Sequence, residues 1–130
     1  MKRSISLVID GPGGAVLLVR RPDDDDSLPG VWGLPAALLR AGESEHEALV
    51  RAGRAKLGVE VEPIEPVGAE QGMRDWRARI VAGTPQVPQA DDGATQYVDL
   101  RWGEPAELVP AARAGSLCAR ALLRAVGCSW

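Results

Sequence analysis

Lys56 and two nearby alanines define one helical face on which chemistry could take place. Ala55 and Lys56 lie three and four residues after Ala52, so a helix would place the three side chains on one face. An ammonium group on a concave surface can attract an anionic ligand directly. It can also act as a base or nucleophile if burial lowers its pKa. The third reading is a lysine that extends into solvent and has no chemical role.

Five arginines are predicted to form a basic wall in a protein whose formal net charge is -3. Arg21 ends an apolar run and could reach a phosphate, and Arg77 lies within a strand pattern. Trp76, beside it, could stack on a base or another planar group, or pack in the core. We therefore expect Arg21, Trp76 and Arg77 to contact a ligand. The five arginines of the wall are Arg20, Arg21, Arg74, Arg77 and Arg79.

A mixed sheet with helices on its faces is predicted to position these side chains. Residues 4–10 alternate as in a half-buried strand, and the apolar run at 15–21 follows a Gly-Pro-Gly-Gly turn, so we predict a hairpin. Residues 59–69 contain two prolines and are typical of an edge strand. Further strands are predicted at 74–81 and 96–102, and helices at 105–108 and 117–125.

The main helix is predicted to begin after Ser44 and to end at Gly58. Ser44 and Glu47 have the spacing of a capping box, and Gly58 can adopt the left-handed conformation that ends a helix. Gly53 lies inside this helix although glycine costs roughly 1 kcal/mol relative to alanine there. We therefore expect a packing or functional reason for Gly53.

The stretch Ala37 to Val59 resembles the box of the Nudix superfamily, which is a Gly, five residues, Glu, seven residues, then Arg-Glu-apolar-x-Glu-Glu-x-Gly-apolar. Glu43, Arg51, Gly58 and Val59 match it without a gap. The segments 17–35 and 99–108 also resemble the family. The resemblance implies an α/β Nudix fold, an α/β/α sandwich with a mixed β-sheet, as a single Nudix-like domain over residues 1–130. In the family, the Glu-Arg pair helps orient the helix.

Five positions depart from the family pattern. In the family, positions 52, 55 and 56 carry the glutamates that hold magnesium, which prefers hard oxygen ligands. Replacing three ionised carboxylates by Ala52, Ala55 and Lys56 changes the local formal charge from -3 to +1. Two unit charges about 4 Å apart interact by about 4 kcal/mol at an effective dielectric constant of 20, so a nearby ammonium strongly opposes a divalent ion. The departures are Ala37, Ala52, Gly53, Ala55 and Lys56.

These features predict a Nudix-type protein with a degenerate box that binds a nucleotide or another phosphorylated or anionic small molecule. We expect no metal site and no cofactor, and the tentative catalytic residues are Glu43, Arg51 and Lys56. Conventional magnesium-dependent hydrolysis would be lost or replaced by metal-independent chemistry. One alternative is an active diphosphate hydrolase with relocated carboxylates, namely Glu43, Glu45, Asp91 and Asp92. Another is a protein-interaction module without catalysis.

Composition limits the partners. The chain has 15 basic and 18 acidic residues, which gives no general attraction for a nucleic-acid polymer or an anionic membrane. No apolar stretch approaches the roughly 20 residues that span a bilayer, so we predict a cytoplasmic protein and leave a homodimer open. Cys118 and Cys128 are expected to be reduced thiols, Asp23 to Asp26 a solvated loop tip, and Trp32 and Trp102 core residues.

Overall fold

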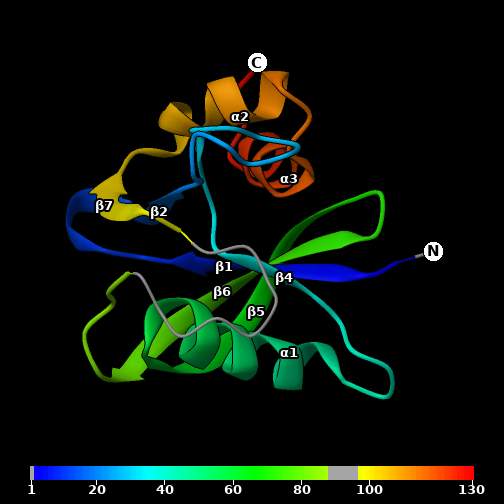
Figure 1. Cartoon of the computed structure of the whole chain (residues 1–130), viewed down its shortest axis with the longest axis vertical. Coiled ribbons are helices and arrows are strands. Elements are labelled where there is room, and N and C mark those ends of the chain that lie inside the picture. Colours follow the sequence, from blue (N-terminus) through cyan, green and yellow to red (C-terminus); the bar gives the residue numbers. More distant parts are fainter. Residues whose placement is uncertain (1, 88–96) are drawn as a thin grey trace.

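A four-stranded mixed sheet forms the centre of the fold (Figure 1). The computed structural model describes residues 2–87 and 97–130. The strand order is β4 (Ala36–Leu38), β1 (Ser4–Ile9), β6 (Met73–Ala82) and β5 (Glu60–Glu70). β1 runs parallel to β6 and antiparallel to β4, and β5 runs antiparallel to β6. The predicted mixed sheet is confirmed, and β5 lies at its edge as its prolines indicated.

The predicted hairpin between the first two strands is wrong. β2 (Val16–Arg20) follows a short 3-10 turn, η1 (Pro12–Gly14), and joins β1 only through an isolated bridge between Asp10 and Val16. It then enters a separate antiparallel sheet, between β3 (Trp32–Gly33) and β7 (Asp99–Gly103). Nearly all of β1 and β2 is buried, so both faces of each strand are covered.

One helix covers one face of the central sheet. The helix α1 (Glu45–Ala52) begins with the predicted capping box, in which Ser44 Oγ accepts a hydrogen bond from the Glu47 amide. It continues as a π-helical turn, η2 (Gly53–Leu57), and ends at Gly58, whose φ is 69°. A Cβ atom on Gly53 would lie 3.1 Å from Val61 Cγ1. Gly53 is therefore explained by close packing on β5.

Two helices cover the opposite face (Figure 1). A 3-10 turn, η3 (Pro105–Leu108), leads into α2 (Val109–Arg113), and α3 (Leu117–Ala125) packs against β5 and β6. Each side of the sheet has its own apolar core, one centred on Leu49 and Leu57 and the other on Leu108 and Leu122. The result is an α/β/α sandwich, as predicted.

Two surface predictions are corrected by the structure. Trp102 is 43% exposed, because it lies on the edge strand β7 and its ring covers Gly11. The loop at 23–26 is not uniformly solvated, because the Asp25 side chain is only 11% exposed and accepts a hydrogen bond from the Leu28 amide at 2.8 Å. Trp32 is half-buried and packs against the core below α2 and α3.

No helix within residues 2–87 and 97–130 has the length and apolar character needed to cross a membrane. The single domain over 1–130, the cytoplasmic location and the homodimer stay predictions.

Candidate ligand-binding site

The face of α1 and η2 that carries Ala52 and Lys56 is buried. Ala52 is 0% exposed and Lys56 only 7% exposed. The Lys56 Nζ lies 5.2 Å from the centroid of the Tyr97 ring, within the range of a cation–π interaction. The reading of Lys56 as a solvated side chain is therefore wrong. The ammonium lies in the interior of the fold beside an aromatic face.

Tyr97 joins this helix to the edge strand β4. Its hydroxyl oxygen accepts a hydrogen bond from the Ala36 backbone N–H at 3.0 Å. Burial raises the pKa of Tyr97 to about 12, so the phenol is neutral at pH 7. A neutral ring fixed in place offers its π-face to the Lys56 ammonium. Tyr97 could not be identified from the sequence, because a single tyrosine at the start of a predicted strand gives no chemical signal of its own.

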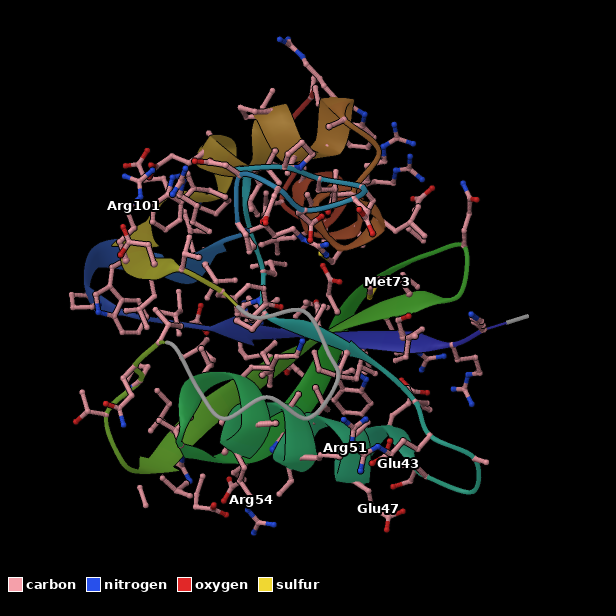
Figure 2. The ribbon with its side chains drawn as sticks, viewed as in Figure 1. Glu43, Glu47, Arg51, Arg54, Met73 and Arg101 are labelled. Carbon is pink, nitrogen blue, oxygen red and sulfur yellow. The ribbon has the colours of Figure 1, made fainter. Side chains whose placement is uncertain are left out.

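Glu43, in the loop before α1, and Arg51, in the last turn of α1, form a bidentate ion pair (Figure 2). Arg51 Nε donates to Glu43 Oε2 at 2.8 Å, and Arg51 Nη2 donates to Glu43 Oε1 at 2.9 Å. The Arg51 hydrogen bonds are the main cause that lowers the pKa of Glu43 to about 2. Arg51 Nη2 also donates to the Leu38 carbonyl at 2.8 Å. The pair therefore fixes the loop before α1, and Glu43 is ionised at neutral pH.

Arg21 lines a cavity of about 250 Å³ on the α3 side of the sheet. Arg21 Nη1 pairs with Asp25 Oδ2 at 3.2 Å, so its guanidinium is held at the cavity wall. Met73 contributes from the sheet (Figure 2). The cavity is lined by Arg21, Ser27, Leu28, Ala36, Met73 and residues 114–118.

A buried polar pair lies in the sheet next to this cavity. Ala36, Ser6 and Asp75 are cross-strand neighbours on β4, β1 and β6. Ser6 Oγ donates to Asp75 Oδ1 at 2.6 Å, and both residues are 0% exposed. Burial raises the pKa of Asp75 to about 7. The sequence gives no sign of this burial, since nothing in the spacing of Asp75 indicates the Ser6 partner.

Cys118, in the first turn of α3, lines the same cavity. Its thiol lies 3.4 Å from Ser116 Oγ, and burial followed by the Asp75 charge raises its pKa. Cys118 is thus a protonated thiol at neutral pH. Both cysteines are free in the structure, which agrees with the expected reduced state.

Trp76 and Arg77 do not meet at one site. Trp76 Nε1 donates to Glu45 Oε1 at 2.9 Å, and its ring packs against the core below α1. Arg77 Nε donates to Asp10 Oδ2 at 2.7 Å. Successive strand residues face opposite sides of a sheet, and Arg74 also pairs with Glu45, at 3.4 Å. The predicted basic wall is therefore wrong, because β6 divides its arginines between two faces and carboxylates neutralise them.

The described residues do not fit a conventional magnesium site. Within 2–87 and 97–130, no three side chains of the His, Cys, Asp and Glu types gather at one point. Glu43 is committed to Arg51, and Glu45 contacts Trp76, Arg74 and Arg3. Asp91 and Asp92, the other proposed carboxylates, lie outside the described residues.

Comparisons with known proteins give a consistent family. The NUDIX domain family matches residues 1–124 of this chain. The NAD-capped RNA hydrolase NudC of Pseudomonas aeruginosa is 35% identical over 102 residues, which are 74% of this chain and 34% of that protein. This chain thus spans about a third of the length of the curated relatives it matches.

Solved structures share the fold. The solution structure of the E. coli ORF135 protein has a TM-score of 0.68 and 26% identity, covering 97% of this chain and 92% of that one. An ADP-ribose pyrophosphatase from Streptococcus suis has a TM-score of 0.71 and 19% identity, covering 97% and 90%. At that identity the second likeness concerns the fold alone.

Proposed function

This chain belongs to the Nudix superfamily. We propose that it binds a nucleotide or another phosphorylated small molecule, and that a cationic side chain takes the place of the metal ion used by proteins with the conventional Nudix box. The observation that carries the proposal is the buried Lys56 ammonium beside Tyr97. A fixed cation can stabilise a phosphate without a divalent ion. Conventional magnesium-dependent hydrolysis would then be lost or replaced by metal-independent chemistry.

Two cationic positions would frame the ligand. Ala36 lines the cavity that contains Arg21, and the backbone of the same residue holds Tyr97, over which Lys56 lies. The cavity of about 250 Å³ is the place for an uncharged part of the ligand, such as a base. Arg21 and Lys56 would contact its phosphates. Glu43 and Arg51 would act by holding the loop, and we assign no ligand contact to Trp76 or Arg77, given their carboxylate partners.

Binding in the presence of a chelator tests this proposal. Purified protein would be titrated with nucleoside diphosphates, triphosphates, nucleotide sugars and dinucleotides in EDTA, and affinity followed by calorimetry. We expect Lys56→Met to weaken binding at least about tenfold, because the buried cation is lost. Lys56→Arg should retain more affinity than Lys56→Met. Arg113→Glu, an exposed position at the end of α2, is the control.

Far-ultraviolet circular dichroism and thermal unfolding would establish that each variant is folded. Equal affinity of wild-type protein and Lys56→Met for every ligand that binds would overturn the role of the cation.

Hydrolysis is the second candidate function, and the 35% identity with NudC favours it. Incubation of NAD-capped RNA and free dinucleotides with the protein, with magnesium and with EDTA, would test it. Product formation that needs magnesium and disappears in Asp92→Asn would support relocated carboxylates. Product formation that continues in EDTA and disappears in Lys56→Met would support metal-independent chemistry at the same site. No response to any ligand would favour the protein-interaction module.

A further inference from the structure

The strand β7 carries an exposed apolar row at the edge of the smaller sheet. Among the described residues, β2 is its only strand neighbour. Val98, directly before the strand, donates its amide to the Arg20 carbonyl at 2.9 Å and so continues along β2. Val98 is 50% exposed, Trp102 is 43% exposed, and Leu100 between them is half-buried. Because alternate residues of a strand share a face, these three side chains form one row.

The backbone of β7 is available on the side away from β2. The Leu100 N–H donates to Asp99 Oδ1 at 2.8 Å, so its hydrogen bond is made with an exposed side chain instead of with β2. In an antiparallel ladder, every second residue directs its N–H and C=O away from the neighbouring strand. Leu100 and Trp102 therefore direct theirs towards the outer edge. Such an edge can act as a template for another strand.

The opposite face of β7 carries one acid and one base, two positions apart. Asp99 is exposed, and the Arg101 side chain is 47% exposed at the periphery of the molecule (Figure 2). Arg101 Nη2 lies 2.6 Å from Glu107 Oε1, and its guanidinium carbon lies 4.5 Å from the centroid of the Trp32 ring. These contacts hold the guanidinium in place. Since a guanidinium has five N–H donors, Arg101 can bind a second carboxylate.

A second copy of the same strand is complementary to both faces. If two β7 strands pair antiparallel about a two-fold axis at Leu100, Asp99 of each copy lies opposite Arg101 of the other. On the other face, Val98 of each copy lies opposite Trp102 of the other. A register centred on Asp99 or on Arg101 would place two like charges directly opposite each other, which is unfavourable. The charges therefore select the register in which the exposed apolar side chains also meet.

We propose that β7 is the interface of a two-fold symmetric homodimer, in which the small sheets of two copies join into one continuous sheet. Every contact occurs twice in such an isologous interface, so two ion pairs and two contacts between Val98 and Trp102 form together. Pairing of the strands also gives the outward N–H and C=O groups of β7 partners from another backbone. The interface does not depend on the proposed ligand site.

Charge reversal tests the pairing. Sedimentation velocity would follow association of the wild-type protein over about a hundredfold range of concentration. In Asp99→Arg alone or Arg101→Asp alone, like charges face each other across the axis, so the dissociation constant of the dimer should rise at least about tenfold. An equimolar mixture of these two variants has opposite charges at both positions and should form a heterodimer.

A matched pair of valine substitutions tests the apolar row. Val98→Thr places a hydroxyl group in the interface and should raise the dissociation constant by about threefold or more. Val81→Thr makes the same change on β6, where the valine is 52% exposed, and should leave the dissociation constant unchanged.

Far-ultraviolet circular dichroism would establish that each variant is folded. Three results would each overturn the proposal: a wild-type protein that stays monomeric, single charge variants that dimerise as the wild type does, and a mixture of the charge variants that stays monomeric. Equal effects of Val98→Thr and Val81→Thr would also overturn it, because the row on β7 would then have no special part in association.

Discussion

Asp75 is the residue whose environment departs most from what its sequence position suggests. Its carboxyl group is fully buried between β6 and α3, where Ser6 donates one hydrogen bond. Cys118 lies on α3, and its pKa is raised first by burial and then by the Asp75 charge. A buried carboxylate without a cation beside it is costly, so the neutral acid is favoured in the folded state.

This burial predicts a pH-dependent stability. The pKa of Asp75 is about 7 in the folded protein and about 3.8 without the fold. Between pH 3.8 and pH 7, folding is therefore accompanied by proton uptake at Asp75. The stabilisation present below pH 3.8 is lost as the pH rises to 7. Asp75→Asn keeps an acceptor for Ser6, removes this dependence, and should raise the free energy of unfolding at pH 8 by up to about 4 kcal/mol.

Urea unfolding between pH 4 and pH 8 measures the effect, with the exposed Asp24→Asn as the control. Parallel stability curves for wild-type protein and Asp75→Asn would contradict the assignment.

At the scale of the element, the capping box is the clearest local feature that fixes where α1 begins. Ser44 Oγ accepts from the Glu47 amide at 3.1 Å, and Glu47 Oε1 accepts from the Ser44 amide at 3.0 Å. Ser44→Ala removes one of these bonds and should lower the free energy of unfolding by about 1 kcal/mol. Ser129→Ala, near the C-terminus and exposed, should leave it unchanged. Chemical denaturation of the two variants compares them, and an equal loss in both would refute the capping contribution.

Local signals explain what the sequence could predict. The capping box, Gly58 and the prolines of β5 act through neighbouring residues, so their elements were predicted correctly. β3 and β4 were missed because two or three residues carry no period. The hairpin was wrong because the choice between two sheets depends on contacts far apart in sequence, such as Ser6 with Asp75. Lys56, Glu43 and Arg51 are proposed for the site from the family spacing, whereas the position of Tyr97 beside Lys56 required the fold.

At the scale of the whole molecule, the distance between α3 and the sheet depends on Gly68. A Cβ atom at this position would lie 2.8 Å from the Ala121 carbonyl oxygen, which belongs to the helix backbone and cannot move away alone. Gly68→Ala should therefore displace α3 and lower the free energy of unfolding by about 1–3 kcal/mol. Gly33→Ala is the matched control, since within the part of the chain that the structure describes no atom outside its chain neighbours lies within 4 Å of its Cβ position.

Thermal unfolding of the two glycine variants would test this. Equal melting temperatures for both would show that the helix layer can yield at Gly68. A lower melting temperature only for Gly68→Ala would agree with the tight contact.

The uneven pairing of β5 also has a consequence for how copies of the chain meet. Its register shifts near Pro63 and Pro66, and a proline has no amide hydrogen to offer. The outer rim of the sheet is thus a poor template for fibril growth. In concentrated solutions, copies of the protein should not associate through the edge of β5. Any self-association would use another part of the surface.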